Sequence, residues 1–139
     1  MPYQRIIVPL DGSPLAELAA EHAAELARLC QSHLIFLRVV DPGGEHEAAQ
    51  YLFQVNQEAH YEGLDTEAMV RFGKPAEVIV QTAAEMKADL VLLSSHGRTG
   101  LARQVFGSVA EAVVRLAPCP VTVVKTHLQH EQSRQPLSA

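Results

Sequence analysis

A glycine-containing segment between an apolar run and a helix-start signal carries the residues best suited to bind a phosphate. Residues 89–93 (DLVLL) predict a buried strand, and Gly97 and Gly107 follow, separated by nine residues. Ser108 opens the sequence SVAE, which is typical of a capping box at a helix start. Backbone N–H groups and the helix dipole favour an anion there, and glycines let the backbone approach a ligand. The segment therefore predicts a phosphate site, although it contains no lysine and differs from the P-loop pattern.

Asp11 is a carboxylate that could recognise the rest of a nucleotide. It follows the apolar run 5–10 (RIIVPL), at the expected carboxyl end of a strand. In open α/β sheets the ligand crevice lies at such strand ends, where a carboxylate can accept a hydrogen bond from an adenine amine or a ribose hydroxyl. An Asp-Gly pair is also typical of a turn in which the aspartate binds local N–H groups. Both interpretations stay open for Asp11.

Two further side chains of the glycine-containing segment could take part in binding. Arg98 could contact phosphate oxygens through its guanidinium group, or it could lie on a solvated surface. His96 could act as a general base, but its motif contains no evident nucleophile or carboxylate partner. A role in ordering the loop is the favoured interpretation for His96, and both alternatives stay open for Arg98.

Five runs of aliphatic and β-branched residues alternate with four segments of helical periodicity. The predicted strands are 5–10, 33–40, 66–72, 89–93 and 120–125, and the predicted helices are 14–31, 45–62, 75–87 and 109–116. This alternation predicts an α/β fold in which a doubly wound, five-stranded parallel sheet has helices on both faces.

Three of these segments carry more specific expectations. In helix 14–31, one apolar face is approximated by Leu15, Leu18, His22, Leu26 and Leu29. Helix 45–62 has its pattern at Ala48, Leu52, Val55 and Ala59. Strand 66–72 is more polar and alternates, which predicts an edge strand with one solvent-exposed face.

Composition excludes several classes of function. A chain of 139 residues with a formal net charge of −5 is not a general nucleic-acid binder, because such proteins depend on a basic surface. No apolar run reaches the roughly 20 residues of a membrane-spanning helix. The first residues run directly into a strand without a signal peptide, so we expect a cytoplasmic protein.

The chain is expected to form one domain over residues 1–125, followed by a polar, flexible tail over 126–139. Cys30 and Cys119 are far apart and have neither metal-binding nor redox spacing. Two buried thiols are the favoured interpretation, and a disulfide or a reactive role is the alternative.

The glycine-containing segment resembles the nucleotide-binding signature of the universal stress protein family. That signature is a glycine, two residues, a second glycine, nine residues, and then Gly-Ser or Gly-Thr. Gly97, Gly107 and Ser108 match it, and Ser94 stands in place of the first glycine. The resemblance extends to residues 9–13 (PLDGS) and 73–75 (GKP), and it covers nearly the whole chain to Lys125.

The resemblance implies a strand order of 3-2-1-4-5, which brings Asp11 and Gly97 to one crevice. It also implies that Asp11 and Val39 contact the adenosine of ATP, that the glycines and Ser108 hold the phosphates, and that Mg²⁺ or Mn²⁺ bridges phosphate oxygens. The implied nucleotide-binding residues are Pro9, Leu10, Asp11, Val39, Ser94, His96, Gly97, Arg98, Gly107, Ser108 and Val109. A homodimer through the last strand, with Val121 and Val123, is implied as well.

The function expected from this resemblance is an ATP-binding regulator of a stress response that acts through a homodimer. A slow ATPase is an alternative, although the loop offers no evident carboxylate to orient a water molecule. A third possibility is an interaction protein with a vestigial site, which Ser94 keeps open. A phospho-acceptor domain of the receiver type is disfavoured, because no acidic cluster or lysine accompanies Asp11 in the matching segments.

Overall fold

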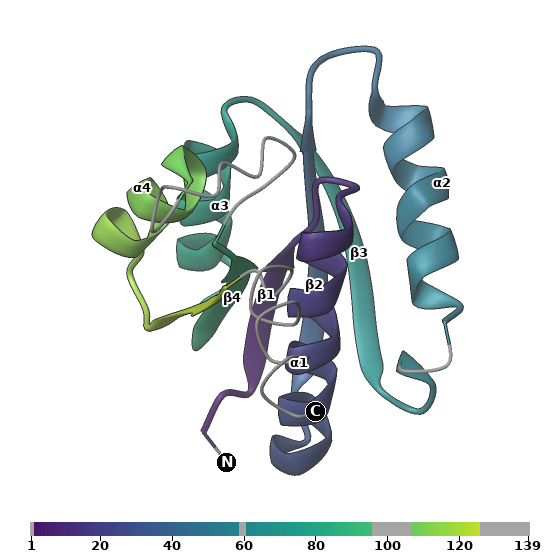
Figure 1. Ribbon diagram of the computed structural model, residues 1–139, viewed down its shortest axis with the longest axis vertical. Helices are drawn as coiled ribbons and strands as arrows, with labels where there is room; N and C mark the ends of the chain where they lie inside the picture. The colour runs from purple at the N-terminus through teal and green to yellow at the C-terminus, as the bar shows by residue number, and fades with distance from the viewer. Residues whose placement is uncertain (1, 59–60, 96–106, 126–139) are drawn as a thin grey trace, which may run out of the picture.

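The computed structural model describes residues 2–58, 61–95 and 107–125. Within these ranges the chain forms five strands and four helices that alternate along the sequence (Figure 1). In order they are β1 (Arg5–Pro9), α1 (Pro14–Cys30), β2 (His33–Val40), α2 (Glu45–Asn56), β3 (Asp65–Phe72), α3 (Pro75–Glu85), β4 (Leu90–Ser94), α4 (Ser108–Leu116) and β5 (Val121–Val124).

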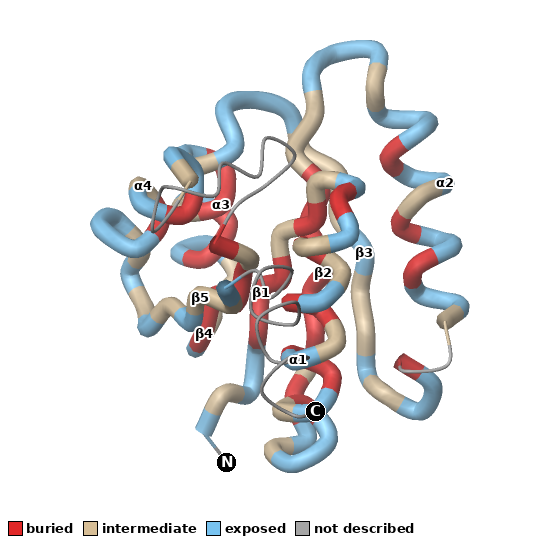
Figure 2. The backbone as a smooth tube through the Cα atoms, viewed as in Figure 1, coloured by how far each residue is buried: buried red, intermediate tan, exposed pale blue. Residues whose placement is uncertain are grey.

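The five strands form one parallel sheet in the order β3-β2-β1-β4-β5, which confirms the predicted fold and strand order. The central strands are buried on both faces, and Ile6, Ile7 and Val8 have no exposed surface (Figure 2). One hydrophobic cluster joins α1 and α2 to the sheet, and a second joins α3 and α4 to it. The helices therefore cover both faces, as a doubly wound sheet requires.

The face of α1 that packs on the sheet consists of alanines, so the leucine face predicted from the sequence was wrong. The buried residues of α1 are Ala16, Ala19, Ala20, Ala23, Ala24 and Ala27. By contrast, Leu18 is 38% exposed and Leu29 is 76% exposed. Alanine carries no atom beyond Cβ, so this face lets the helix approach the sheet closely, whereas the larger leucine side chains dominate the sequence pattern.

β3 is an edge strand, as predicted, but both of its faces are partly covered. Val70 packs against the cluster under α1 and α2, whereas Met69 packs against the cluster under α3 and α4. On the same face as Met69, Arg71 donates hydrogen bonds to Thr82 Oγ1 at 3.0 Å and Glu85 Oε2 at 2.7 Å. The expected solvent-exposed face is the one that carries Val70, since Ala68 and Phe72 on this face are exposed and α2 covers it only in part.

The remaining expectations concern α2, the cysteines and membrane insertion. Helix α2 buries Ala48, Leu52 and Val55 as expected, but it ends at Asn56 instead of residue 62, and Ala59 lies outside the described residues.

Both cysteines are free and half-buried. Burial, and secondly the charge of Asp89, raise the pKa of the Cys119 thiol. In the described ranges, no helix combines the length and apolar character needed to cross a membrane.

Candidate functional site

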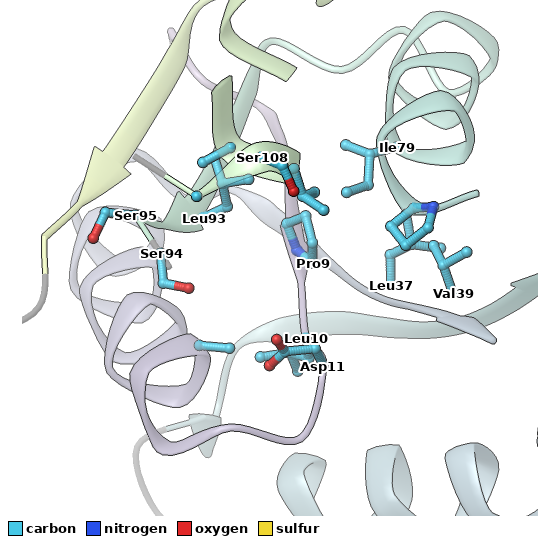
Figure 3. Close-up of a pocket in the computed structure, with 15 residues that line it drawn as sticks. Pro9, Leu10, Asp11, Leu37, Val39, Ile79, Leu93, Ser94, Ser95 and Ser108 are labelled. Carbon is cyan, nitrogen blue, oxygen red and sulfur yellow. The ribbon is translucent and has the colours of Figure 1, made fainter. Parts of the chain in front are cut away.

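A pocket of about 300 Å³ opens at the carboxyl-terminal edge of the sheet (Figure 3). Its walls come from the ends of β1, β2 and β4 and from the first turns of α1, α3 and α4. Open α/β sheets bind ligands at this edge, at the point where the strand order reverses. The volume reaches the lower end of the range that is typical of small-molecule sites.

The pocket lies where β1 and β4 separate. β1 pairs with β2 along its whole length from Arg5 to Pro9, but it pairs with β4 only at Ile6 and Ile7. After β1 the chain enters α1 on one face of the sheet, and the helix that follows β4 lies on the other face. The strand ends therefore diverge, and a space remains between the two connections.

The Asp11 side of the pocket is a turn fixed by local hydrogen bonds. The Ser13 N–H donates to Asp11 Oδ1 at 2.9 Å, and Gly12 adopts a φ of +88° that favours glycine. Ser13 is the N-cap of α1, where its Oγ accepts a hydrogen bond from the Ala16 N–H at 3.2 Å. Asp11 and Ala16 both line the pocket. Asp11 thus holds a turn and also lines the pocket, so the two interpretations of its sequence are compatible.

The opposite side of the pocket is formed by the end of β4 and the start of α4. Ser94 and Ser95 line it, as do the first residues of α4. The Gly107 N–H donates to the Ser95 carbonyl at 2.6 Å, and the Ser95 N–H donates to the Val124 carbonyl at 2.8 Å. These two bonds anchor the residue after β4 and the residue before α4, which are the two ends of the segment carrying the glycine spacing.

The capping box predicted at Ser108 is not formed. Gly107 is the N-cap of α4, no side chain caps the helix, and Ser108 is its first helical residue. The helix therefore starts one residue earlier than the sequence pattern indicated. The Ser108 side chain is exposed and lies at the pocket (Figure 3). The first N–H groups of a helix have no partner within the helix, so this end of α4 presents donors and a positive dipole.

A third side of the pocket is apolar. Leu37 and Val39 lie two residues apart on β2, so their side chains point to the same face of the sheet. Figure 3 shows them with Ile79 of α3 on one side of the pocket, whereas Ser94 and Ser95 lie on the other. The pocket therefore combines an apolar slot, a carboxylate and a group of hydroxyl and N–H donors.

Most of the residues predicted for the site are brought together in this pocket. Those that line it are Pro9, Leu10, Asp11, Val39, Ser94, Gly107, Ser108 and Val109. His96, Gly97 and Arg98, which were predicted with them, lie outside the described residues.

Further lining residues were not predicted, namely Ala16, Leu37, Pro75, Ile79, Leu93, Ser95 and Ala110. Leu37 could have been found, because it precedes Val39 by two residues on the same strand. Pro75 could also have been found, because it begins α3 directly after the turn that ends β3, and this turn lies at the carboxyl-terminal edge of the sheet. Ile79 and Ala110 could not have been found, because in the sequence they are only apolar residues of helices α3 and α4.

The chemistry of these walls suits a ligand with a flat apolar part, hydroxyl groups and an anionic part. The apolar slot can hold a ring, Asp11 can accept hydrogen bonds from hydroxyl or amine groups, and the start of α4 can donate to an anion. Among the described residues, no group of three or more His, Cys, Asp or Glu side chains is placed to hold a metal ion.

Comparison with known proteins identifies the family. The model of the Universal stress protein family matches residues 2–125. The chain belongs to the universal stress protein family. A universal stress protein of Methanocaldococcus jannaschii is 34% identical over 140 residues, covering 88% of this chain and 82% of the relative.

Two solved structures of universal stress proteins in complex with adenine nucleotides share the fold. One universal stress protein, solved in complex with cAMP, has a TM-score of 0.76 and 29% identity and covers 90% of this chain and 98% of its own. Another, from Archaeoglobus fulgidus in complex with dAMP, has a TM-score of 0.72 and 28% identity and covers 90% of this chain and 100% of its own.

Proposed function

We propose that this universal stress protein binds an adenosine nucleotide, with ATP as the physiological form, and acts as a nucleotide-dependent switch in a stress response. The observation that carries the proposal is the convergence of three walls on one pocket: the Val39 slot, the Asp11 turn and the start of α4. The adenine ring would occupy the slot, Asp11 would accept a hydrogen bond from the adenosine, and the phosphates would lie against Gly107 and Ser108.

The complexes of related proteins with cAMP and dAMP support the adenosine part of this proposal. The spacing from Gly97 to Ser108, which matches the family signature in the sequence, favours ATP. A bound Mg²⁺ or Mn²⁺ would neutralise phosphate charge. It would take oxygen ligands, with phosphate and water oxygens among them.

Gly107→Val tests the phosphate wall. Gly107 has a φ of −72°, which a valine can adopt, so the substitution adds bulk to the pocket without straining the backbone. We expect ATP affinity to fall on the order of tenfold, because an added side chain crowds the first N–H groups of α4. Isothermal titration calorimetry measures the affinity. Val114→Ala is the control, because Val114 is 45% exposed on the same helix and does not line the pocket. Equal affinities for the two variants would contradict a phosphate site at Gly107.

We also propose that the protein forms a homodimer through β5. This strand is at one edge of the sheet and pairs with β4 on its other side. The Pro120 and Val124 carbonyls accept hydrogen bonds from Val91 and Ser95, so the backbone groups of these alternate residues face β4. The amides of Val121 and Val123 therefore face the free edge, where a second copy of β5 can pair with them.

Val123→Pro tests the dimer. Proline removes an N–H that faces the free edge, and the hydrogen bonds between β4 and β5 keep their donors and acceptors. We expect the variant to be a monomer and the control Val123→Ala, which retains the N–H, to remain a dimer. Size-exclusion chromatography with multi-angle light scattering measures the mass. A Val123→Pro variant that stays dimeric would place the interface elsewhere.

A further inference from the structure

A buried arginine lies directly behind the pocket. Arg38 belongs to β2, between Leu37 and Val39, which both line the pocket. Its side chain is only 6% exposed. Because side chains alternate along a strand, it points to the opposite face, as does Phe36 of the cluster under α1 and α2. A charge so far removed from water requires compensating partners.

Arg38 has such partners on helix α2. Its guanidinium carbon lies 4.9 Å from the centroid of the Tyr51 ring, and Nη2 lies 3.5 Å from Glu47 Oε1. The Tyr51 hydroxyl in turn donates to Glu17 Oε2 at 2.7 Å. Burial, followed by this bond to Glu17, raises the pKa of Tyr51, so the phenol keeps its proton as a donor. These contacts connect β2 through α2 to the first turn of α1.

The turn that fixes Asp11 leads directly into the first turn of α1. Glu17 follows Ala16, which lines the pocket and donates its N–H to Ser13, whose own N–H binds the Asp11 carboxylate. Asp11 and Arg38 both act on the Tyr51 hydroxyl, since the first raises its pKa and the second lowers it. The two charges therefore lie within electrostatic range of the same group.

The signs of the charges give Arg38 a specific role. Asp11, Glu17 and Glu47 are carboxylates, whereas Arg38 is a cation that pairs with Glu47 and acts on the same Tyr51 hydroxyl as Asp11 and Glu17. Without it the carboxylates repel one another, and the Tyr51 ring loses the cation that packs on it. Both effects act on the turn that orients Asp11 toward the pocket.

We propose that Arg38 is a positioning residue of the nucleotide site, which holds the Asp11 carboxylate and the first turn of α1 in place through Tyr51 and Glu17. The inference rests on the proposed nucleotide binding. Arg38 itself does not line the pocket, because its side chain lies on the face of the sheet opposite Leu37 and Val39. Its effect on affinity must therefore pass through Asp11.

Calorimetric titration of the full-length chain with ATP tests this. We expect Arg38→Met to weaken ATP binding roughly tenfold and Arg38→Lys, which keeps the charge, to restore about half of the loss on a logarithmic scale. The matched control is Arg28→Met in the last turn of α1, at the opposite end of this helix, and its affinity should equal that of the wild type. Circular dichroism confirms that each variant is folded.

A double-mutant cycle separates positioning from a general structural effect. In an Asp11→Ala background, Arg38→Met should cause at most about a twofold further loss, because the group that it positions is already absent. A second full tenfold loss would overturn the inference. If Arg38→Met does not fold, Tyr51→Phe provides the test. It removes only the bond to Glu17 and should weaken binding about threefold, whereas an unchanged affinity would overturn the inference.

The wild-type titration distinguishes a failure of the proposed nucleotide binding from a failure of the proposed role of Arg38. A wild-type protein that binds no nucleotide would overturn the proposed function and this inference together. A wild-type protein that binds ATP, with Arg38→Met indistinguishable from Arg28→Met, would overturn the role of Arg38 alone.

Discussion

Asp11→Ala should weaken ATP binding by roughly 10- to 100-fold, which corresponds to the loss of a hydrogen bond to a charged group. Asp11 is half-buried, lines the pocket at the end of β1, and is the charged residue among the described residues that line it. It is therefore the side chain best placed to distinguish a nucleoside from an apolar ligand. Calorimetric titration of the nucleotide-free protein measures the effect.

Asp11→Asn is the control for the second role of this residue. Its amide oxygen can still accept the Ser13 N–H, so the turn before α1 should be preserved. Asp11→Ala removes that acceptor and should also cost about 0.5–1.5 kcal/mol of unfolding free energy. If Asp11→Ala loses stability but keeps its ATP affinity, Asp11 is only a turn residue, as one interpretation of the sequence holds.

Ala23→Leu should destabilise the protein by about 1–3 kcal/mol, because it inserts a larger side chain into a close helix-sheet contact. Ala23 has no exposed surface and lies on the alanine face of α1. Urea unfolding of the nucleotide-free protein measures the change, because bound nucleotide would add stability of its own.

Two controls on the same helix complete this test. Glu25→Leu adds the same side chain to an exposed position and should change stability by no more than about 0.5 kcal/mol. Leu29→Ala should be similarly neutral, because Leu29 is 76% exposed. Truncation of a leucine in the core would lower the free energy of unfolding by about 2–5 kcal/mol, so a loss of that size at Leu29 would contradict the packing of α1 through its alanine face.

The sheet could be predicted from the sequence because its central strands are continuous apolar runs. β2 was predicted over the residues that it occupies, and the fold class followed from the alternation of strands and helices. The packing face of α1 could not be predicted in the same way. Leucine and alanine patterns coexist on that helix, and only the distance between helix and sheet decides which of them is buried.

The residues of the candidate site that could be predicted are those at the carboxyl ends of strands, because a parallel sheet fixes where these ends lie. Asp11, Val39 and Ser94 all lie at or just beyond the ends of strands, so a parallel sheet brings them to one edge. Ile79 reaches the pocket from α3, and its place depends on how that helix packs. The burial of Arg38 could not be predicted, because nothing in the sequence indicates that its side chain packs against Tyr51 of α2.

The start of α4 could not be predicted correctly from the local sequence pattern at Ser108. The sequence SVAE is typical of a capping box, but Gly107 takes the N-cap position, and its N–H bonds to Ser95. The anchor at Ser95 is distant in sequence, so a local pattern could not reveal it. As a consequence, Ser108 lines the pocket and does not cap the helix.

The central claim is that the pocket holds an adenosine nucleotide. The most direct measurement is the nucleotide content of protein purified without added ligand, determined by heat release and chromatography, followed by calorimetric titration of the emptied protein with ATP and Mg²⁺. We expect either co-purified adenine nucleotide or a Kd on the order of micromolar, which corresponds to about −8 kcal/mol. An empty protein that gives no binding heat would contradict the claim, and the glycine-containing segment would then have a structural role only.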